Sequence, residues 1–151
     1  MTDALDGVLK RLAEKGPEFG PGLSNHGPMA VDALVALGRA DVIESWAEWY
    51  AARLSDRPQA RNPVAADGWR EALGDIGRAG DWSSFFVRTL NDGPWQDALA
   101  VWAPRLLPGI MAGATHGVLR TAHAVRSLER DGTLQRIAEL GEGLAYWAAR
   151  Y

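Results

Sequence analysis

Cysteine is absent from the 151-residue chain, and its absence excludes several kinds of chemistry. Disulfide frameworks, cysteine-ligated zinc, iron–sulfur clusters and cysteine nucleophiles all require a thiol. Lysine is scarce, because only Lys10 and Lys15 among the 16 basic residues are lysines. Both lie in the first polar helical segment, where we expect them to be solvated. A mechanism that uses a buried lysine, such as a Schiff base, is therefore disfavoured.

Basic charge and long apolar runs are also missing. The net charge is −3, so there is no basic excess for binding a nucleic-acid duplex, although a local basic patch remains open. No apolar run reaches the length of a transmembrane helix. Residues 1–6 are acidic and lack the apolar core of a signal peptide. We therefore expect a soluble, cytoplasmic protein that binds neither nucleic acid nor membrane.

The composition is that of a globular domain rich in tryptophan. Hydrophobic residues make up 47% and charged residues 23%, which argues against disorder. A chain of this length forms one domain with a sizeable core. Seven tryptophans are a high count, so we expect an aromatic core or an aromatic-lined cleft.

Apolar residues recur at helical spacing along nearly the whole chain, and no segment shows the alternation of a strand. We therefore predict an all-α fold, a compact bundle of seven or eight helices with no sheet, forming a single domain over residues 1–151. Residues 16–28 and 55–66 are predicted to be irregular connections. The predicted helices cover residues 3–15, 29–37, 42–54, 67–78, 82–91, 94–102, 109–130 and 134–150.

Small polar residues mark several of the predicted helix starts. Such side chains accept hydrogen bonds from the free backbone N–H groups of a first helical turn. Asp41 is followed three residues later by Glu44, as in a capping box. The other expected caps are Thr2, Asp81 and Thr133.

Three histidines, His26, His116 and His123, are the main candidates for chemistry. His26 directly precedes a predicted helix start, where the helix dipole disfavours added positive charge. Its imidazole should therefore stay neutral, as a metal ligand or a general base requires. The more common role of such a residue is that of a partly buried histidine bonded to loop backbone, and this alternative stays open.

His116 and His123 lie two helical turns apart on one helix face, with Arg120 between them. A helix does not bury two histidines and an arginine without partners. The rise over seven residues is about 10.5 Å, so the two imidazoles reach one metal only by leaning together or if Gly117 loosens the helix. A hydrogen-bonded seam with carboxylates of another helix explains the pattern equally well.

Other catalytic patterns are not recognisable in the sequence. The serines lack the context of a nucleophile elbow. Gly16, Gly20 and Gly22 do not follow a strand, so a dinucleotide-binding turn is not supported. The acidic residues are scattered and form no evident catalytic pair.

Two segments together resemble the questin oxidase-like family. They are residues 24–30, SNHGPMA, and residues 115–124, THGVLRTAHA. Weaker similarity lies in residues 102–109, WAPRLLPG, and 143–151, GLAYWAARY, so the resemblance runs from about residue 20 to the end. The set of motifs carries the resemblance, because no single motif is specific.

The resemblance implies an oxidoreductase that uses oxygen to oxidise an aromatic polyketide, such as an anthraquinone, or to cleave its ring. It implies a non-haem iron with His26, His116 and His123 as ligands. Arg120 would lie behind the ligands or orient the substrate. NADPH as an electron donor is implied by the resemblance alone, since no nucleotide-binding motif is present.

The chain departs from the family in length. Family members are substantially longer, and this sequence matches their N-terminal part. The last predicted helix runs to Tyr151 without a polar tail. We therefore expect this chain to be part of a longer protein. Either a homodimer or a partner chain supplies the missing part, or the chain is a remnant with altered activity, or its coding sequence is truncated. The alternative to an enzyme is a non-catalytic helical binding or assembly subunit that needs a partner chain to complete the site.

Overall fold

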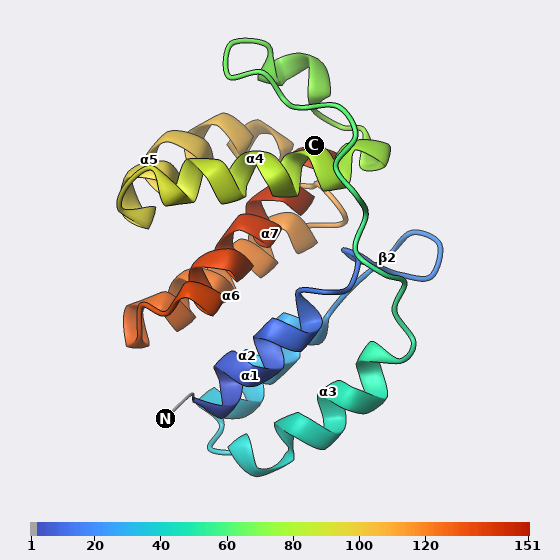
Figure 1. The fold of residues 1–151 in the computed structure, drawn as a ribbon, viewed down its shortest axis with the longest axis vertical. Coiled ribbons are helices and arrows are strands. Elements are labelled where there is room, and N and C mark those ends of the chain that lie inside the picture. The colour runs from blue at the N-terminus through green and yellow to red at the C-terminus, as the bar shows by residue number, and fades with distance from the viewer. Residues whose placement is uncertain (1–2) are drawn as a thin grey trace.

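The computed structural model describes residues 3–151 and confirms the all-α class. Seven α-helices form in this part of the chain (Figure 1). None of the helices formed by residues 3–151 is both long and apolar enough to cross a membrane. The helices are α1 (Ala4–Leu12), α2 (Gly27–Ala36), α3 (Ile43–Ala51), α4 (Ala79–Asn91), α5 (Trp95–Leu106), α6 (His116–Arg130) and α7 (Leu134–Arg150).

One small hairpin departs from the expectation of no sheet. Strand β1 (Glu18–Phe19) pairs antiparallel with β2 (Leu23–Ser24) inside the segment predicted to be irregular. Gly20 and Gly22 both have positive φ, at 61° and 78°, and close the turn. Strands of two residues are too short to show alternation in a sequence, which is why the pattern missed them.

The helices fall into two groups, each with its own apolar core (Figure 1). Helices α1 to α3 form what we call the N-terminal layer, and α4 to α7 form the C-terminal layer. The N-terminal core is mainly aliphatic and includes Leu5, Leu12, Val31 and Ile43, all fully buried. The C-terminal core is aromatic and contains Trp69, Trp82, Phe85, Phe86, Trp102 and Trp147.

Polar contacts join the two layers. Asp6 of α1 accepts a hydrogen bond from Arg136 of α7 at 3.0 Å, and both side chains are buried. Ser24 of β2 and Tyr146 of α7 share a hydrogen bond of 2.8 Å between their hydroxyl groups. The layers are therefore held in register by directional, charged interactions as well as by apolar packing.

Helices α6 and α7 pack closely in the C-terminal layer, and glycine residues line their contact. A Cβ atom on Gly117 would lie 2.6 Å from Cα of Trp147, closer than real atoms approach. Gly143 of α7 faces Thr121 of α6 in the same way, with its Cβ position 3.0 Å from the Thr121 amide nitrogen. Gly117 thus serves close packing within a regular helix, and it does not loosen α6.

The helix caps predicted at Asp41 and Asp81 are wrong, and the partners of these side chains explain why. Asp41 pairs with Arg39 at 2.9 Å, and α3 begins after Val42 without a side-chain cap. Asp81 lies inside α4, where its carboxylate accepts from the backbone amides of the preceding loop. Thr133 does cap α7 by accepting from the Arg136 amide at 3.4 Å. Thr2 lies outside the described residues.

Two of the predicted helices differ most from the structure in their bounds. Residues 67–78 form two 3₁₀ turns, Trp69–Ala72 and Ile76–Arg78, separated by Gly74 with φ of 74°. The helix predicted from residue 109 begins at His116, because the residues before it form a left-handed turn. That turn positions the first candidate site residue.

Candidate functional site

His116 stands at the start of α6, behind a strained turn. Gly113, Ala114 and Thr115 all have positive φ, at 56°, 52° and 70°. This region costs a residue with a side chain roughly 1–2 kcal/mol, and such strain concentrates at functional sites. The turn brings two carbonyl oxygens, of Gly113 and Ala114, to within 2.9 and 3.0 Å of Nδ1 of His116. Carbonyl oxygens only accept hydrogen bonds, so Nδ1 carries a proton and donates it, which leaves Nε2 for another partner.

His26 stands at the opposite side of the site, where the hairpin enters α2. Its backbone amide donates to the Tyr50 hydroxyl of α3 at 2.9 Å. The neighbouring Asn25 is buried and braces the turn, donating to the Gly16 carbonyl and accepting from the Gly27 amide. The ring of His26 is exposed to solvent. The described contacts do not include the expected bonding of this imidazole to loop backbone, because the amide binds a tyrosine hydroxyl and Nε2 of the ring faces another histidine.

The imidazoles of His26 and His116 meet edge to face. Their Nε2 atoms lie 2.9 Å apart, and the ring planes cross at 83°. His26 belongs to the N-terminal layer and His116 to the C-terminal layer, so the pair bridges the two. We call these two residues the histidine pair.

His123 contacts a different part of the N-terminal layer. Its Nδ1 donates to the carboxylate of Asp32 on α2 at 2.8 Å. Arg126 and Arg130 of α6 bind the same carboxylate. Burial raises the pKa of Asp32, but the hydrogen bonds from His123, Arg126 and Arg130 outweigh it, and the pKa lies below its usual value of 3.8. Asp32 is therefore ionised at neutral pH and holds His123 in one tautomer.

Arg120 is bonded to α7 and not to either histidine. Its guanidinium forms two hydrogen bonds with Glu139 of α7, of 2.6 and 2.9 Å, and both side chains are buried. Burial raises the pKa of Glu139, and the positive charge of Arg120 opposes that rise. The three polar residues expected on one face of α6 thus divide between two neighbours, since His123 contacts α2 and Arg120 contacts α7.

The structure brings together two of the three predicted iron ligands. His26 and His116 touch, whereas His123 has Asp32 as its partner two helical turns along α6. Among residues 3–151, no group of three ligand-type side chains converges on one point. The seam of hydrogen bonds with carboxylates, the alternative to a metal site, describes His123 and Arg120 but not His116.

The partner residues Asp32 and Glu139 were not identified from the sequence. Asp32 is the single charged residue in the apolar segment predicted as a helix over residues 29–37. That anomaly was a usable signal, because a charge on an apolar face needs a partner. Glu139 gave a weaker signal, because α7 also carries Arg136, Glu142 and Arg150, so that a further charge does not stand out.

Exposed apolar side chains accompany the histidines in sequence. Leu23, which precedes His26, is 62% exposed, and Met111, which precedes His116, is 71% exposed. Leu119 lies one turn further along α6 and is 44% exposed. It also lines a shallow groove of about 200 Å³ with Ala122, His123 and Arg126. The segments that carry the candidate residues therefore present apolar surface to solvent.

Comparison of the chain with protein-family models, curated proteins and solved structures finds no match.

Proposed function

We propose that this chain is an oxidoreductase that resembles questin oxidase and works in the cytoplasm. It oxidises an aromatic, anthraquinone-like substrate with oxygen, or cleaves its ring, at a non-haem iron held by the histidine pair. The observation that carries the proposal is the 2.9 Å separation of the two Nε2 atoms. The resemblance of residues 24–30 and 115–124 to the family supports the same assignment.

The geometry of the histidine pair fits two neighbouring ligand positions of a metal ion. Two nitrogens bonded at about 2.1 Å and about 90° apart are separated by about 3.0 Å. Nδ1 of His116 donates to backbone carbonyls, and this type of contact orients metal-binding histidines. The left-handed turn at Ala114 and Thr115 keeps that ring in place.

His123 remains the predicted third ligand. Its Nδ1 is held by a carboxylate, as in many metal-binding histidines, which leaves Nε2 free to bind. His123 lies two helical turns from His116, so its side chain must move toward the histidine pair to bind the same metal. Arg120 has its charge occupied by Glu139, so we assign it a positioning role, in which it fixes α6 and thereby His116.

Iron at this site would supply the activation of oxygen. The side chains of His26 and His116 would hold the metal. The exposed Leu119, in the groove beside His123, gives a planar aromatic substrate an apolar surface. No nucleotide-binding motif is present, so we propose that the substrate itself supplies the electrons.

The first test is metal content after anaerobic reconstitution with ferrous iron. We expect about one iron per chain, since the histidine pair forms one site. His26→Ala and His116→Ala should each lose the iron and keep the helical circular dichroism spectrum. His123→Asn serves as the matched variant, and iron loss in it would assign the third ligand. A wild-type chain without iron, or iron retained by His116→Ala, would overturn the proposal.

A second test measures the reaction. Iron-loaded protein should consume oxygen in the presence of a hydroquinone or anthraquinone, and His116→Ala should not. Oxygen consumption at the same rate in both proteins would show that the histidine pair is not the site of oxidation.

The second candidate is a non-catalytic binding or assembly subunit that needs a partner chain or a second copy to complete the site. The exposed side chains of Leu23, Met111 and Leu119 favour it, because apolar surface on the segments around the histidines suits an interface. The mass of the protein in solution separates the candidates. A dimer that Met111→Asp converts to a monomer would support this role, whereas a monomer that binds iron and turns over substrate would exclude it.

A further inference from the structure

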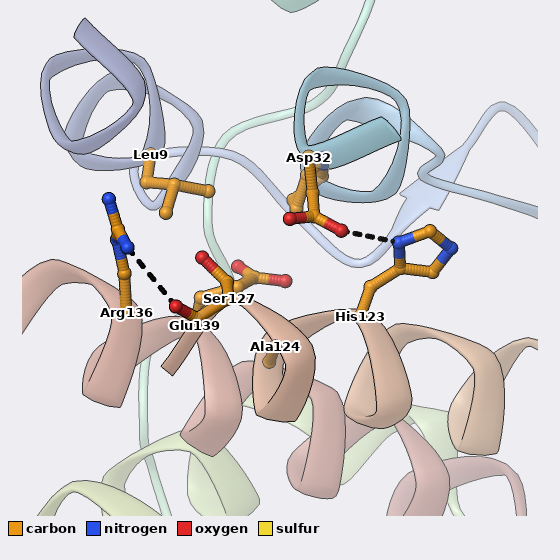
Figure 2. Close-up of a pocket in the computed structure, with 8 residues that line it drawn as sticks. Leu9, Asp32, His123, Ala124, Ser127, Arg136 and Glu139 are labelled. Atoms are coloured by element: carbon orange, nitrogen blue, oxygen red, sulfur yellow. Dashed lines mark hydrogen bonds and ion pairs between the residues drawn. The ribbon is translucent and has the colours of Figure 1, made fainter. Parts of the chain in front are cut away.

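A small internal cavity lies between the two layers, where α1 and α2 meet α6 and α7. Its volume is about 10 Å³, enough for the centre of a single water molecule. Figure 2 shows Asp32 on one side of this space, Ser127 and Glu139 on the other, and the apolar Leu9 at its edge. The cavity is therefore polar over part of its lining and too small for an organic ligand.

Ser127 is the unusual residue of this cavity. Its side chain is only 3% exposed, and its Oγ atom has no hydrogen-bond partner among residues 3–151. The Ser127 carbonyl does have one, since it accepts from Arg136 at 3.1 Å. Buried hydroxyl groups are nearly always bonded, and leaving one unpaired costs about 1–3 kcal/mol. We therefore expect the hydroxyl group of Ser127 to have a hydrogen-bond partner inside the cavity.

Two carboxylates supply the rest of a water site. Asp32 already accepts from His123, Arg126 and Arg130, and Glu139 accepts from Arg120. At Asp32, Oδ2 accepts three hydrogen bonds and Oδ1 accepts one, whereas each carboxylate oxygen of Glu139 accepts one. Each oxygen has about two lone-pair directions, so Oδ1 of Asp32 and the oxygens of Glu139 keep room for a further donor. A water molecule has two protons to give and can accept a third bond. The two protons of a water molecule therefore match the two carboxylates, and its lone pair matches the hydroxyl group of Ser127.

We propose that the cavity binds one structural water molecule that donates to Asp32 and Glu139 and accepts from the hydroxyl of Ser127. The water joins two charge clusters that otherwise do not touch. One cluster contains Asp32 and His123, and the other is the buried pair of Arg120 and Glu139. The site is independent of the proposed function, because it requires neither a metal ion nor a substrate.

The sign of a stability change tests this proposal. If the water is present, Ser127→Ala removes its donor and lowers the melting temperature by about 2–4 °C. If the cavity is dry, the same variant removes an unpaired hydroxyl, and the melting temperature rises. Ser84→Ala is the control for the intrinsic gain of alanine in a helix, because Ser84 lies in α4, makes only an exposed side-chain contact with Arg88 and does not line the cavity. A rise in Ser127→Ala beyond that control would overturn the proposal.

A second variant keeps the hydroxyl and fills the space. Ser127→Thr adds a methyl group, which should displace the water and lower the melting temperature, whereas the methyl group would stabilise a dry cavity. A crystal structure gives the direct result. We expect electron density within hydrogen-bond distance of Ser127 Oγ in the wild type and none in Ser127→Thr. An empty cavity, in a structure that shows other buried waters, would contradict the proposal.

Discussion

The two layers of this molecule differ in how many apolar side chains they bury. Within residues 3–151, the core of the C-terminal layer has twenty buried apolar residues, six of them aromatic, against ten with one aromatic in the N-terminal layer. The smaller layer makes up part of the difference through charge, with Asp6 and Asp32 bound by arginines of the larger one. The histidine pair takes one residue from each layer, so its geometry depends on how firmly the layers are joined.

The largest expected loss of stability comes from a substitution in the aromatic core of the C-terminal layer. Trp82 is fully buried and packs against Phe85, Phe86 and Trp102. Trp82→Ala should lower the free energy of unfolding by about 3–5 kcal/mol, through lost burial and the cavity left behind. Leu12→Ala in the N-terminal core should cost about 2–4 kcal/mol. Urea denaturation measures both, and a larger loss for Leu12→Ala would reverse the comparison of the layers.

The second effect concerns the buried ion pair inside the C-terminal layer. Arg120→Met leaves Glu139 buried without its counter-charge, which should cost about 3 kcal/mol. The double variant Arg120→Met with Glu139→Leu should recover most of that loss, since two apolar side chains replace the pair. Thermal unfolding of the three proteins checks this expectation. A double variant as unstable as the single one would show that the pair is worth more than its isosteric replacement.

The same double variant distinguishes two roles of Arg120. On the proposed function, if Arg120 only positions α6 and the apolar pair keeps that packing, the double variant should bind as much iron and oxidise substrate as fast as the wild-type sequence. If Arg120 orients the substrate, iron binding should persist while the rate of oxidation falls.

The third effect tests the close contact of α6 with α7. Gly117→Ala places a Cβ atom 2.6 Å from Cα of Trp147, and such overpacking costs about 1–3 kcal/mol. Gly7 is the matched control in the N-terminal layer, because it lies in α1 and the nearest atom to its Cβ position is Glu44 Oε1 at 3.6 Å. Gly7→Ala should stabilise the protein by about 0.5–1 kcal/mol. Denaturant midpoints measure both changes in stability. Equal changes for Gly117→Ala and Gly7→Ala would show that the α6–α7 contact is no tighter than the surroundings of Gly7.

The periodicity of apolar residues was sufficient to predict most of the fold. The helix over residues 134–150 was predicted with the bounds that α7 has, because Thr133 caps it and leucines recur along one face. The caps predicted at Asp41 and Asp81 were wrong, since each of these carboxylates has a partner other than the first turn of its predicted helix. A capping rule sees only local sequence, and these partners compete with it.

The candidate site was predicted less completely than the fold. His26 and His116 are ninety residues apart, and nothing in their spacing indicates that their rings touch. The spacing of His116, Arg120 and His123 along α6 did not reveal that Arg120 binds Glu139 of α7 while His123 binds Asp32 of α2. Which neighbour a side chain contacts depends on packing between helices, and periodicity within one helix carries no information about it.

The smallest expected effect concerns the charge that joins the layers at Asp32. Its pKa in the folded protein lies below the value of 3.8 expected for an unfolded chain. The stabilisation is therefore fully present well above pH 3.8 and is lost as the pH falls through the lower pKa of the folded state. Asp32→Asn should cost about 1 kcal/mol at pH 6, where the carboxylate is ionised, because its arginine partners are partly solvated.

The dependence on pH identifies the carboxylate as the cause of that loss. The difference in unfolding free energy between wild type and Asp32→Asn should shrink as the pH falls from about 5 to about 3, because protonation of Asp32 removes the same charge that the variant lacks. Urea denaturation at several pH values in this range measures it. Asp67→Asn is the control, since Asp67 is exposed and has no ion-pair partner among residues 3–151. A difference that stays constant down to pH 3 would mean that Asp32 holds the layers by shape and neutral hydrogen bonds. The weaker layer would then be joined to the stronger one by packing, and charge would have only a minor part in setting the distance between His26 and His116.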